Sequence, residues 1–289
     1  MPIFKRFIHN SGKLEINPII RTETEFFSTT VLKENAKRRS SATINTNFYD
    51  ISASGYISAL KGHNPTPASE TTFLGEIVSE GKIVGGKPEP LNFYIAHYKD
   101  RHKANIDLTT TFSTGQGNPP GDCSCGFGGL GPLIINGLPY GSINKYSSEA
   151  DSLPESLRPI IGEPSTEAKK FLTQRSSAKF TSFSKNDSNY SARLGKTCLG
   201  IRSLDVCVYV QKHGDSGMSI EAVRDEMMAL GCKHAVFFDG SDSSLLYTPE
   251  SGFLVSQADA KDQTCIAGAA FYWHSEPSQR EPENKAKIK

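Results

Sequence analysis

The sequence predicts a single α+β domain, built on a mixed β-sheet with flanking helices. Three observations support this class. The 289 residues are enough to bury one substantial core. Residues 73–98 alternate strand-like runs with turn signals, and residues 205–239 have the pattern of a strand, a helix and a second strand. We therefore expect one domain over residues 1–275, followed by a charged, flexible tail at 276–289.

Charge and hydropathy argue against two classes of partner. Lysine and arginine number 32 against 31 acidic residues, so no strong field attracts nucleic acid or an anionic membrane. The chain has no stretch of about 18 apolar residues, the length that a membrane-spanning helix needs. Its first residues lack the uninterrupted apolar core of a secretory signal, which favours the cytoplasm or another export route. We expect neither a nucleic-acid polymer nor a membrane as partner, and the oligomeric state is not indicated.

The first half of the chain is expected to form strands. A basic polar stretch at residues 33–40 leads into a β-prone run at 42–50 that ends in polar groups. Within residues 73–98, the pairs Glu80-Gly81 and Gly85-Gly86 separate apolar runs, which predicts hairpins.

Glycine is dense between residues 113 and 132, which favours a long loop that other backbone approaches closely. A strand at 132–135 and a turn at Asn136-Gly137 are expected next. Most of the six cysteines are expected to be core thiols, since a chain of this length needs no disulfides. Cys123 and Cys125 lie in the glycine-rich segment and fit a disulfide, half of a metal site or neither.

Residues 147–191 are rich in serine, proline and lysine, and we interpret them as an insertion or lid with one helix near 166–174. The strongest pattern follows at 205–239. Ser219 is placed to cap a helix that Gly231 ends, and the apolar run 235–238 predicts a buried strand. That strand delivers Asp239 to the edge of a sheet, where open α/β sheets bind ligands.

Two short motifs suggest other functions. Asp239, Ser241 and Ser243 fit the D-x-S-x-S pattern with which adhesion-type domains bind magnesium, although such domains take further ligands far downstream and only about 45 residues remain here. Ser216 lies in a Gly-Asp-Ser-Gly segment that is similar to the nucleophile segment of trypsin-like proteases, with His97 upstream. The helical pattern after Ser216 opposes that reading, because the protease serine precedes a strand.

A third interpretation accounts for several motifs in one order. The tract from Gly214 to Ser244 resembles the signature of the phosphodiester glycosidase family, whose usual run is L-D-G-G-G-S-S. Three more segments match in the same order, so that the resemblance spans about residues 44–247: they are 44–50, similar to N-G-x-F-F-D, the glycine-rich 128–137, and 196–201, similar to R-T-A-x-G-I.

The resemblance implies a hydrolase that cleaves a glycosidic bond to phosphate, in a sugar phosphodiester, a glycosyl phosphate or a nucleotide substrate, without a cofactor or metal. Such a cleavage passes through an oxocarbenium-like transition state, so a carboxylate near the sugar C1 or an activated water is needed. Asp239 is the candidate for that role. The alternative is a protein that binds a phosphorylated sugar or nucleotide without cleaving it.

The other candidate residues divide by role. Lys196 or Arg193, with the backbone amides of Gly240 and the Gly128-Gly129 segment, would hold the phosphate. The candidate catalytic set is Asp239, Ser241, Ser243, Lys196 and Asn45. The candidate substrate-binding set is Asn47, Asp50, Gly128, Gly129, Asn136, Arg193, Thr197, Asp215, Gly240 and Ser244.

Three residues depart from the family pattern. Ser241 and Asp242 stand where the family has glycines, which adds a hydroxyl and a carboxylate to the loop. Lys196 stands where an arginine is usual, and a lysine loses the bidentate binding of phosphate.

Overall fold

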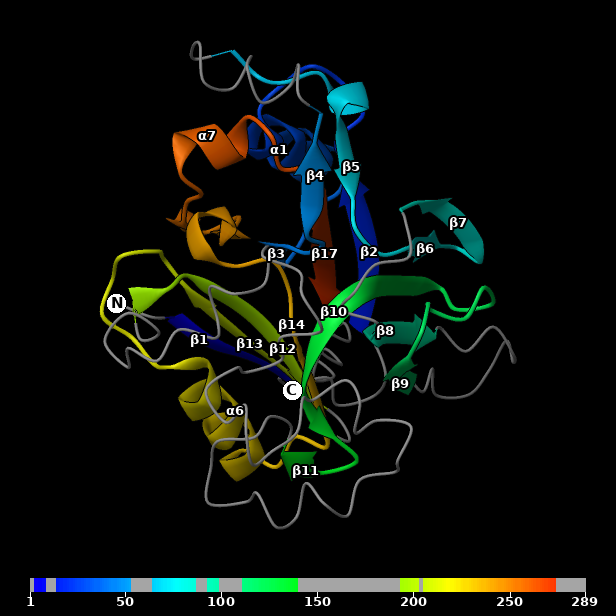
Figure 1. The fold of residues 1–289 in the computed structure, drawn as a ribbon, viewed down its shortest axis with the longest axis vertical. Helices are drawn as coiled ribbons and strands as arrows, with labels where there is room; N and C mark the ends of the chain where they lie inside the picture. Colours follow the sequence, from blue (N-terminus) through cyan, green and yellow to red (C-terminus); the bar gives the residue numbers. More distant parts are fainter. Residues whose placement is uncertain are drawn as a thin grey trace, which may run out of the picture.

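The computed structural model describes residues 3–8, 14–52, 64–86, 93–98, 111–139, 193–202 and 205–273. The helix expected near 166–174, the insertion or lid at 147–191 and the tail at 276–289 lie outside the described residues. Within the described part, two β-sheets meet face to face and helices cover their outer faces (Figure 1). The predicted α+β class, dominated by sheet, is confirmed.

The first sheet has ten described strands in the order β1-β13-β12-β14-β10-β6-β7, with β8 and β11 also paired to β10 and β9 paired to β8. Its strands are β1 (Ile3–Ile8), β6 (Ile77–Ser79), β7 (Lys82–Gly85), β8 (Phe93–Tyr98), β9 (Thr111–Gln116), β10 (Cys125–Ile135), β11 (Leu138–Pro139), β12 (Lys196–Ile201), β13 (Asp205–Gln211) and β14 (His234–Phe237).

The second sheet has the order β16-β15-β3-β17-β2, and β4 and β5 form a separate pair. Its strands and this pair are β2 (Leu14–Ile20), β3 (Ala42–Asn45), β15 (Leu246–Thr248), β16 (Gly252–Val255), β17 (Ala267–Trp273), β4 (Tyr49–Ile51) and β5 (Thr71–Phe73). The helices are α1 (Phe27–Lys37), α6 (Ile220–Ala229) and α7 (Asp259–Asp262), with short 3-10 turns η1 (Ala68–Glu70) and η3 (Ser241–Ser243).

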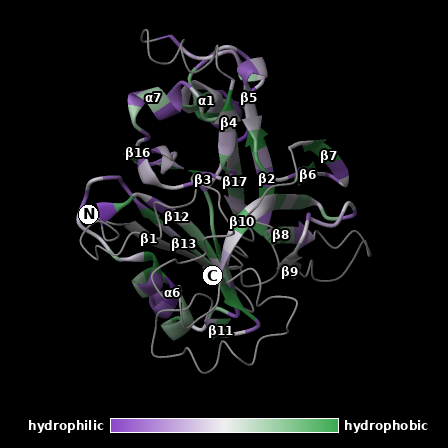
Figure 2. Ribbon diagram, viewed as in Figure 1, coloured by the Kyte–Doolittle hydropathy of each residue, from purple (hydrophilic) through white to green (hydrophobic). Residues whose placement is uncertain are grey.

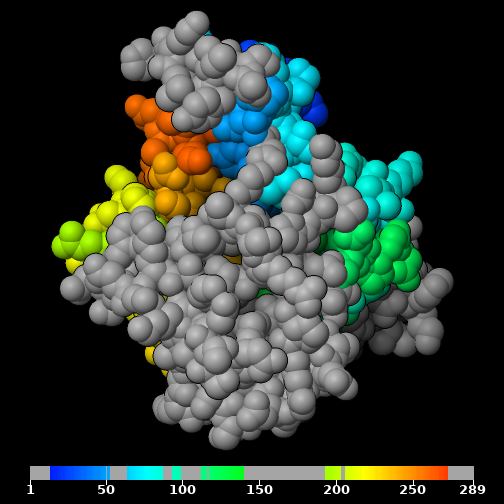
Figure 3. Space-filling model, viewed as in Figure 1, coloured from blue at the N-terminus to red at the C-terminus, as the bar shows by residue number. Residues whose placement is uncertain are grey.

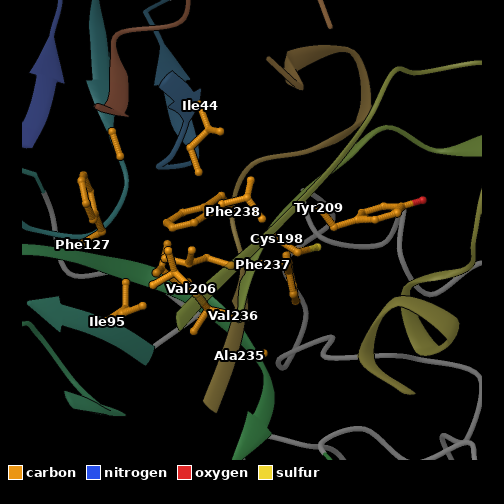
Figure 4. Close-up of a cluster of buried hydrophobic side chains, with 14 of the residues drawn as sticks. Ile44, Ile95, Phe127, Cys198, Val206, Tyr209, Ala235, Val236, Phe237 and Phe238 are labelled. Atoms are coloured by element: carbon orange, nitrogen blue, oxygen red, sulfur yellow. The ribbon is translucent and has the colours of Figure 1, made fainter. Parts of the chain in front are cut away.

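The main core lies between the two sheets. Ile44 of β3 faces Phe238, and Phe127 and Ile95 of the first sheet pack beside them (Figure 4). Alternate residues of β12 face opposite ways: Leu199 meets the second sheet, while a Cβ on Gly200 would approach Met227 and Cys232 on the α6 side. The central strands are mostly hydrophobic, whereas the helices carry both hydrophobic and hydrophilic residues (Figure 2).

The predicted strand-helix-strand unit is confirmed as β13, α6 and β14. The Ser219 hydroxyl accepts from the Ala222 amide at 3.2 Å and caps α6, and Gly231 ends the helix at φ 84°. The unit differs from an open α/β sheet because β12 lies between β13 and β14 and pairs antiparallel with both. The loop after β14 is therefore positioned by an antiparallel sheet.

Two predicted turns are also confirmed. Glu80-Gly81 has φ values of 49° and 74° and joins β6 to β7, and Asn136-Gly137 has values of 52° and 80° and joins β10 to β11. Such left-handed pairs suit the twist of two-residue hairpins.

The prediction of a long loop at 113–132 is wrong for most of that range, because the range is largely occupied by β9 and the fully buried β10. The glycines of β10 serve close contacts within a strand: a Cβ on Gly131 would lie 1.9 Å from the Phe237 ring, and one on Gly126 would lie 2.5 Å from Pro119. Helix α1 begins before the basic polar stretch at 33–40 and covers its first part, and Phe27 and Val31 pack the helix against the second sheet.

All six cysteines are buried free thiols, as expected for core positions, so Cys123 and Cys125 form no disulfide. Among the described residues, no helix has the length and apolar character needed to cross a membrane.

Candidate active site

The loop after β14, residues 239–244, is fastened to both sheets. The Asp239 amide donates to the Thr46 carbonyl at 2.8 Å, and the Asn45 Nδ2 donates to the Asp239 carbonyl at 2.8 Å. The Asn45 Oδ1 accepts from the Thr197 hydroxyl at 2.7 Å and from the Leu245 amide at 2.9 Å. Segments 44–47, 196–197 and 239–245, which the motif order had associated, therefore meet in one place.

Asn45 and Thr197 hold this loop and do not face a ligand. Both side chains are fully buried, and the Asn45 amide group has partners at both its oxygen and its nitrogen. The described hydrogen bonds of Asn45 and Thr197 hold the loop in place, while their expected roles toward substrate stay predictions.

The loop itself is tightly turned. Ser241 has φ 55°, its amide donates to the Gly195 carbonyl at 2.7 Å, and the Ser244 hydroxyl donates to the Ser241 carbonyl at 3.2 Å. A left-handed φ favours glycine, which is the residue of the resembled family pattern at this position. Gly195 is needed for the same contact, because a Cβ there would lie 1.9 Å from the Ser241 oxygen.

The Asp239 carboxyl is half-buried and is held from two directions. Its Oδ1 accepts from the Gly240 amide at 3.0 Å, and the Ser243 hydroxyl is also hydrogen-bonded to it. Burial raises the pKa of Asp239 to about 7, against the opposing effects of the Ser243 hydroxyl, Lys261 and the Gly240 amide. An acid with a pKa near neutrality exchanges protons readily under physiological conditions. The Gly240 amide is occupied by this carboxylate, which replaces its expected role on phosphate.

A second wall of the site comes from β4, which overlaps the motif at 44–50, and from α7, which belongs to no motif. The Lys261 ammonium lies 3.9 Å from the Asp242 carboxylate and 5.5 Å from the centre of the Tyr49 ring. The Tyr49 hydroxyl lies 2.9 Å from the Thr264 hydroxyl and also bonds to Ser243. Figure 3 shows these segments, blue, gold and orange, adjoining on one face of the molecule.

The residues that lead into α7 are hydrogen-bonded to the main-chain carbonyls of the loop. The Ala258 amide donates to the Asp242 carbonyl at 2.9 Å, and the Gln257 Nε2 donates to the Ser243 carbonyl at 2.6 Å. Tyr49 lies within the segment matched at 44–50, so a signal for it existed, whereas Lys261 belongs to no motif. These contacts hold α7, which carries Lys261, against the loop that carries Asp239.

The turn between β13 and α6 borders the loop on its other side. The His213 Nδ1 lies 3.3 Å from the Ser241 hydroxyl and accepts from the Gly195 amide at 3.4 Å. The Arg193 carbonyl accepts from the Gly214 amide at 2.8 Å, and the Arg193 side chain is exposed. The Asp215 carbonyl accepts from Gln211 in the same turn.

Lys196 does not face the Asp239 carboxyl, contrary to expectation. Since Thr197 points to the second sheet, its neighbour Lys196 points to the α6 side, where it is buried and donates to the Leu194 carbonyl at 2.7 Å. Burial lowers the pKa of Lys196 to about 8, and Glu221 of α6 acts in the opposite sense. Arg193 and Lys261 are the more exposed cations beside the loop.

The Gly128-Gly129 segment is also internal. The Gly128 amide donates to the Glu76 carbonyl at 2.8 Å, and a Cβ on Gly129 would lie 2.6 Å from the Leu74 carbonyl. The Asn47 Nδ2 donates to the carbonyls of Leu74, Gly75 and Gly128, at 3.1, 3.2 and 3.0 Å. Asn47 and these glycines therefore join β10 to the strands around it, which replaces the expected binding of phosphate and sugar there.

Two further candidates lie elsewhere or are described only in part. Asn136 is exposed in the β10–β11 turn, beside Lys233 at the start of β14, whereas Asp239 follows the end of that strand. The structure thus separates Asn136 from the other candidates. Asp50 lies in β4 opposite Thr72, and its side chain is outside the described part.

The protease-like pair is not assembled. His97 is buried in β8 with its Nε2 3.1 Å from the Leu14 carbonyl, whereas Ser216 is exposed in the β13–α6 turn. Over the described ranges, no group of three or more His, Cys, Asp or Glu side chains is arranged to hold a metal ion. The adhesion-type interpretation therefore depends on Asp239 and two serines, and their hydroxyls are directed to different partners.

Comparison with known proteins bears on the fold. No protein-family model matches the chain, and no curated protein matches it. Among solved structures, a hypothetical protein from Synechocystis matches with a TM-score of 0.44 and 10% identity, over 94% of this chain and 62% of that one. The chain thus spans less than two thirds of the length of the Synechocystis protein.

A second solved structure is the catalytic domain of zebrafish N-acetylglucosamine-1-phosphodiester alpha-N-acetylglucosaminidase, auto-inhibited by its pro-peptide. It matches with a TM-score of 0.52 and 11% identity, over 95% of this chain and 83% of that one. At this identity the likeness concerns the fold alone, and the chain has an α+β fold similar to that of the zebrafish catalytic domain.

Proposed function

We propose that this protein is a hydrolase of the phosphodiester glycosidase type, which cleaves the bond between a sugar C1 and a phosphate. The substrate class is a sugar phosphodiester, a glycosyl phosphate or a nucleotide sugar. The observation that carries the proposal is the Asp239 carboxyl, with its pKa raised to about 7 beside the Lys261 ammonium. The fold shared with a zebrafish enzyme that bears such an activity in its name supports it more weakly.

The chemistry follows from what surrounds Asp239. In its ionised form the carboxylate takes a proton from a water molecule, the water oxygen bonds to C1, and the C1–O bond to phosphate breaks. A phosphodiester leaves as a stable anion, so a nearby cation contributes more than a strong general acid does. Lys261 supplies that cation, and Ser243 orients the carboxylate through its hydrogen bond.

The direct test is the release of free sugar from a panel of glycosyl phosphodiesters and nucleotide sugars. We expect the wild type to release sugar and Asp239→Asn to release none above background, because the amide cannot take the proton. The expected kcat/KM of the wild type rises as pH increases towards about 7 and then levels off, since the ionised carboxylate is the active form. Equal release by the two proteins would refute the mechanism.

Binding without cleavage is the alternative, and calorimetry on the same panel identifies it. If wild type and Asp239→Asn both gave a heat of binding and neither released sugar, the protein would bind its ligand without cleaving it. Binding that is lost on removal of divalent cations with EDTA would instead favour the adhesion-type interpretation.

Lys261→Gln tests the cation. A charge-assisted contact to phosphate contributes about 1.5–3 kcal/mol, so we expect KM for the cleaved substrate to rise at least about 10-fold. Lys261→Arg should restore most of the affinity. Lys233→Gln, at the opposite end of β14, is the matched control and should leave KM unchanged. An unchanged KM in Lys261→Gln would remove this residue from the site.

A further inference from the structure

His213 and Ser241 form a solvent-facing pair on the side of the loop away from Lys261. The Ser241 Oγ lies 3.3 Å from the His213 Nδ1, and the Gly195 amide lies 3.4 Å from the same nitrogen. A backbone N–H can donate only to a ring nitrogen that carries no proton. The Gly195 contact therefore favours the tautomer in which Nδ1 accepts, and the Ser241 hydroxyl is left to donate to it.

The backbone presents Ser241 in a strained conformation. Its φ of 55° is unfavourable for a residue with a side chain, and the serine is the first residue of the 3-10 turn η3, which follows β14. A tight turn after a strand also places a serine hydroxyl outward at a nucleophile elbow. Glycine would remove both the strain and the hydroxyl.

The Asp239 chemistry does not use this pair. The neighbours that set the charge state of Asp239 are Ser243, Lys261, Gly240 and Asp242, whereas the Ser241 hydroxyl is directed to the β13–α6 turn. The resembled family pattern has glycine at this position, so the pair is a property of this chain.

We propose that Ser241 is a nucleophile activated by His213, which gives the protein an activity on carboxylic esters. The Ser241 Oγ bonds to the ester carbonyl carbon while its proton passes to the His213 Nδ1. The bond to the alcohol oxygen then breaks, and that oxygen takes the proton and leaves. Water repeats the sequence on the acyl-serine, releases the acid and restores the hydroxyl. The contact of 3.3 Å is compatible with this role, because such pairs are often looser without substrate.

The test is covalent labelling by a fluorophosphonate probe, read by mass spectrometry of the peptide that contains residue 241. We expect wild type to be labelled at Ser241 and Ser241→Ala to be unlabelled there. His213→Gln should reduce the labelling rate by at least about 100-fold, the usual contribution of a general base. Ser216→Ala, an exposed serine in the neighbouring turn, is the matched control and should label at the wild-type rate.

A second variant covers the case in which a substitution disturbs the loop. Ser241→Cys keeps a nucleophile at the same position, and we expect its alkylation by iodoacetamide to slow at least about 10-fold when His213→Gln is added. Hydrolysis of 4-nitrophenyl acetate should follow the fluorophosphonate results. No labelling of Ser241 in folded wild type, or equal rates with and without His213, would overturn the proposal.

Discussion

Replacing Asp239 by asparagine is expected to stabilise the folded protein by about 2–4 kcal/mol at pH 8. The carboxyl has an ordinary pKa of 3.8, which burial raises to about 7 in the fold. At about 1.36 kcal/mol for each pK unit, this difference corresponds to about 4 kcal/mol as an upper value. Asparagine keeps an oxygen to accept from the Gly240 amide and carries no charge that burial opposes. The variant would therefore be more stable and inactive.

The size of this effect depends on pH. Below about pH 4 the carboxyl is protonated in both states, so wild type and variant should be equally stable. Between about pH 4 and 7 the unfolded chain ionises and the folded one does not, so wild type loses stability relative to the variant as pH rises. Above about pH 7 the difference stays constant.

Urea unfolding of both proteins from pH 4 to 8 measures the difference directly. Asp242→Asn is the matched control, because that carboxylate is 39% exposed and lies 3.9 Å from Lys261, a contact with a contribution of about 0–1 kcal/mol. A difference between wild type and Asp239→Asn that does not vary with pH would contradict the assigned burial of the Asp239 charge.

Arg21→Ala is expected to destabilise the protein by about 3–5 kcal/mol. Arg21 is almost fully buried, and its Nη1 donates to the carbonyls of Glu25, Thr66 and Gln263 at 2.6, 2.8 and 2.9 Å. Burial lowers the pKa of Arg21, yet the charged group remains the donor for these oxygens. Alanine would leave a cavity and remove the donors of buried carbonyls.

The same substitution should weaken the site. Gln263 and Thr264 follow α7, and Thr264 contacts the Tyr49 hydroxyl, so loss of Arg21 loosens the segment that holds Lys261. Thermal and urea unfolding measure the stability, and the sugar-release assay measures the site. Arg39→Ala is the control, since Arg39 is 69% exposed in its pair with Glu250 and should change stability by less than about 1 kcal/mol. If Arg21→Ala also changed stability by less than about 1 kcal/mol, the prediction would be wrong, and water would be replacing the guanidinium as donor to the carbonyls.

The sequence predicted the fold best where local signals agree. The Ser219 cap, the helical period and Gly231 all indicate the same unit, and β13, α6 and β14 follow. It failed at β10, because Gly131 there is required by the close approach of the Phe237 ring, which is distant in sequence. A glycine that permits close packing and one that forms a loop look the same in a sequence.

The sequence brought several candidate residues into one region, but it did not give the direction of their side chains. Asp239 and Ser243 were expected at the end of a buried strand, and they lie together there. Asn45 was expected near them and is, yet it turns inward to hold the loop. The orientation of Lys196 depends on which residue of β12 faces the second sheet, and no pattern within that fully buried strand reveals this.

The attachment of the loop to both sheets affects how the protein can move. Asp239 bonds to the β3 side through Thr46 and Asn45, and Ser241 bonds to Gly195 beside β12. If the two sheets separated, these hydrogen bonds of the loop would break. While the sheets stay together, the same bonds limit how far the loop can rearrange. For this site, local opening and loss of the core become one cooperative event, so its geometry persists as long as the domain is folded.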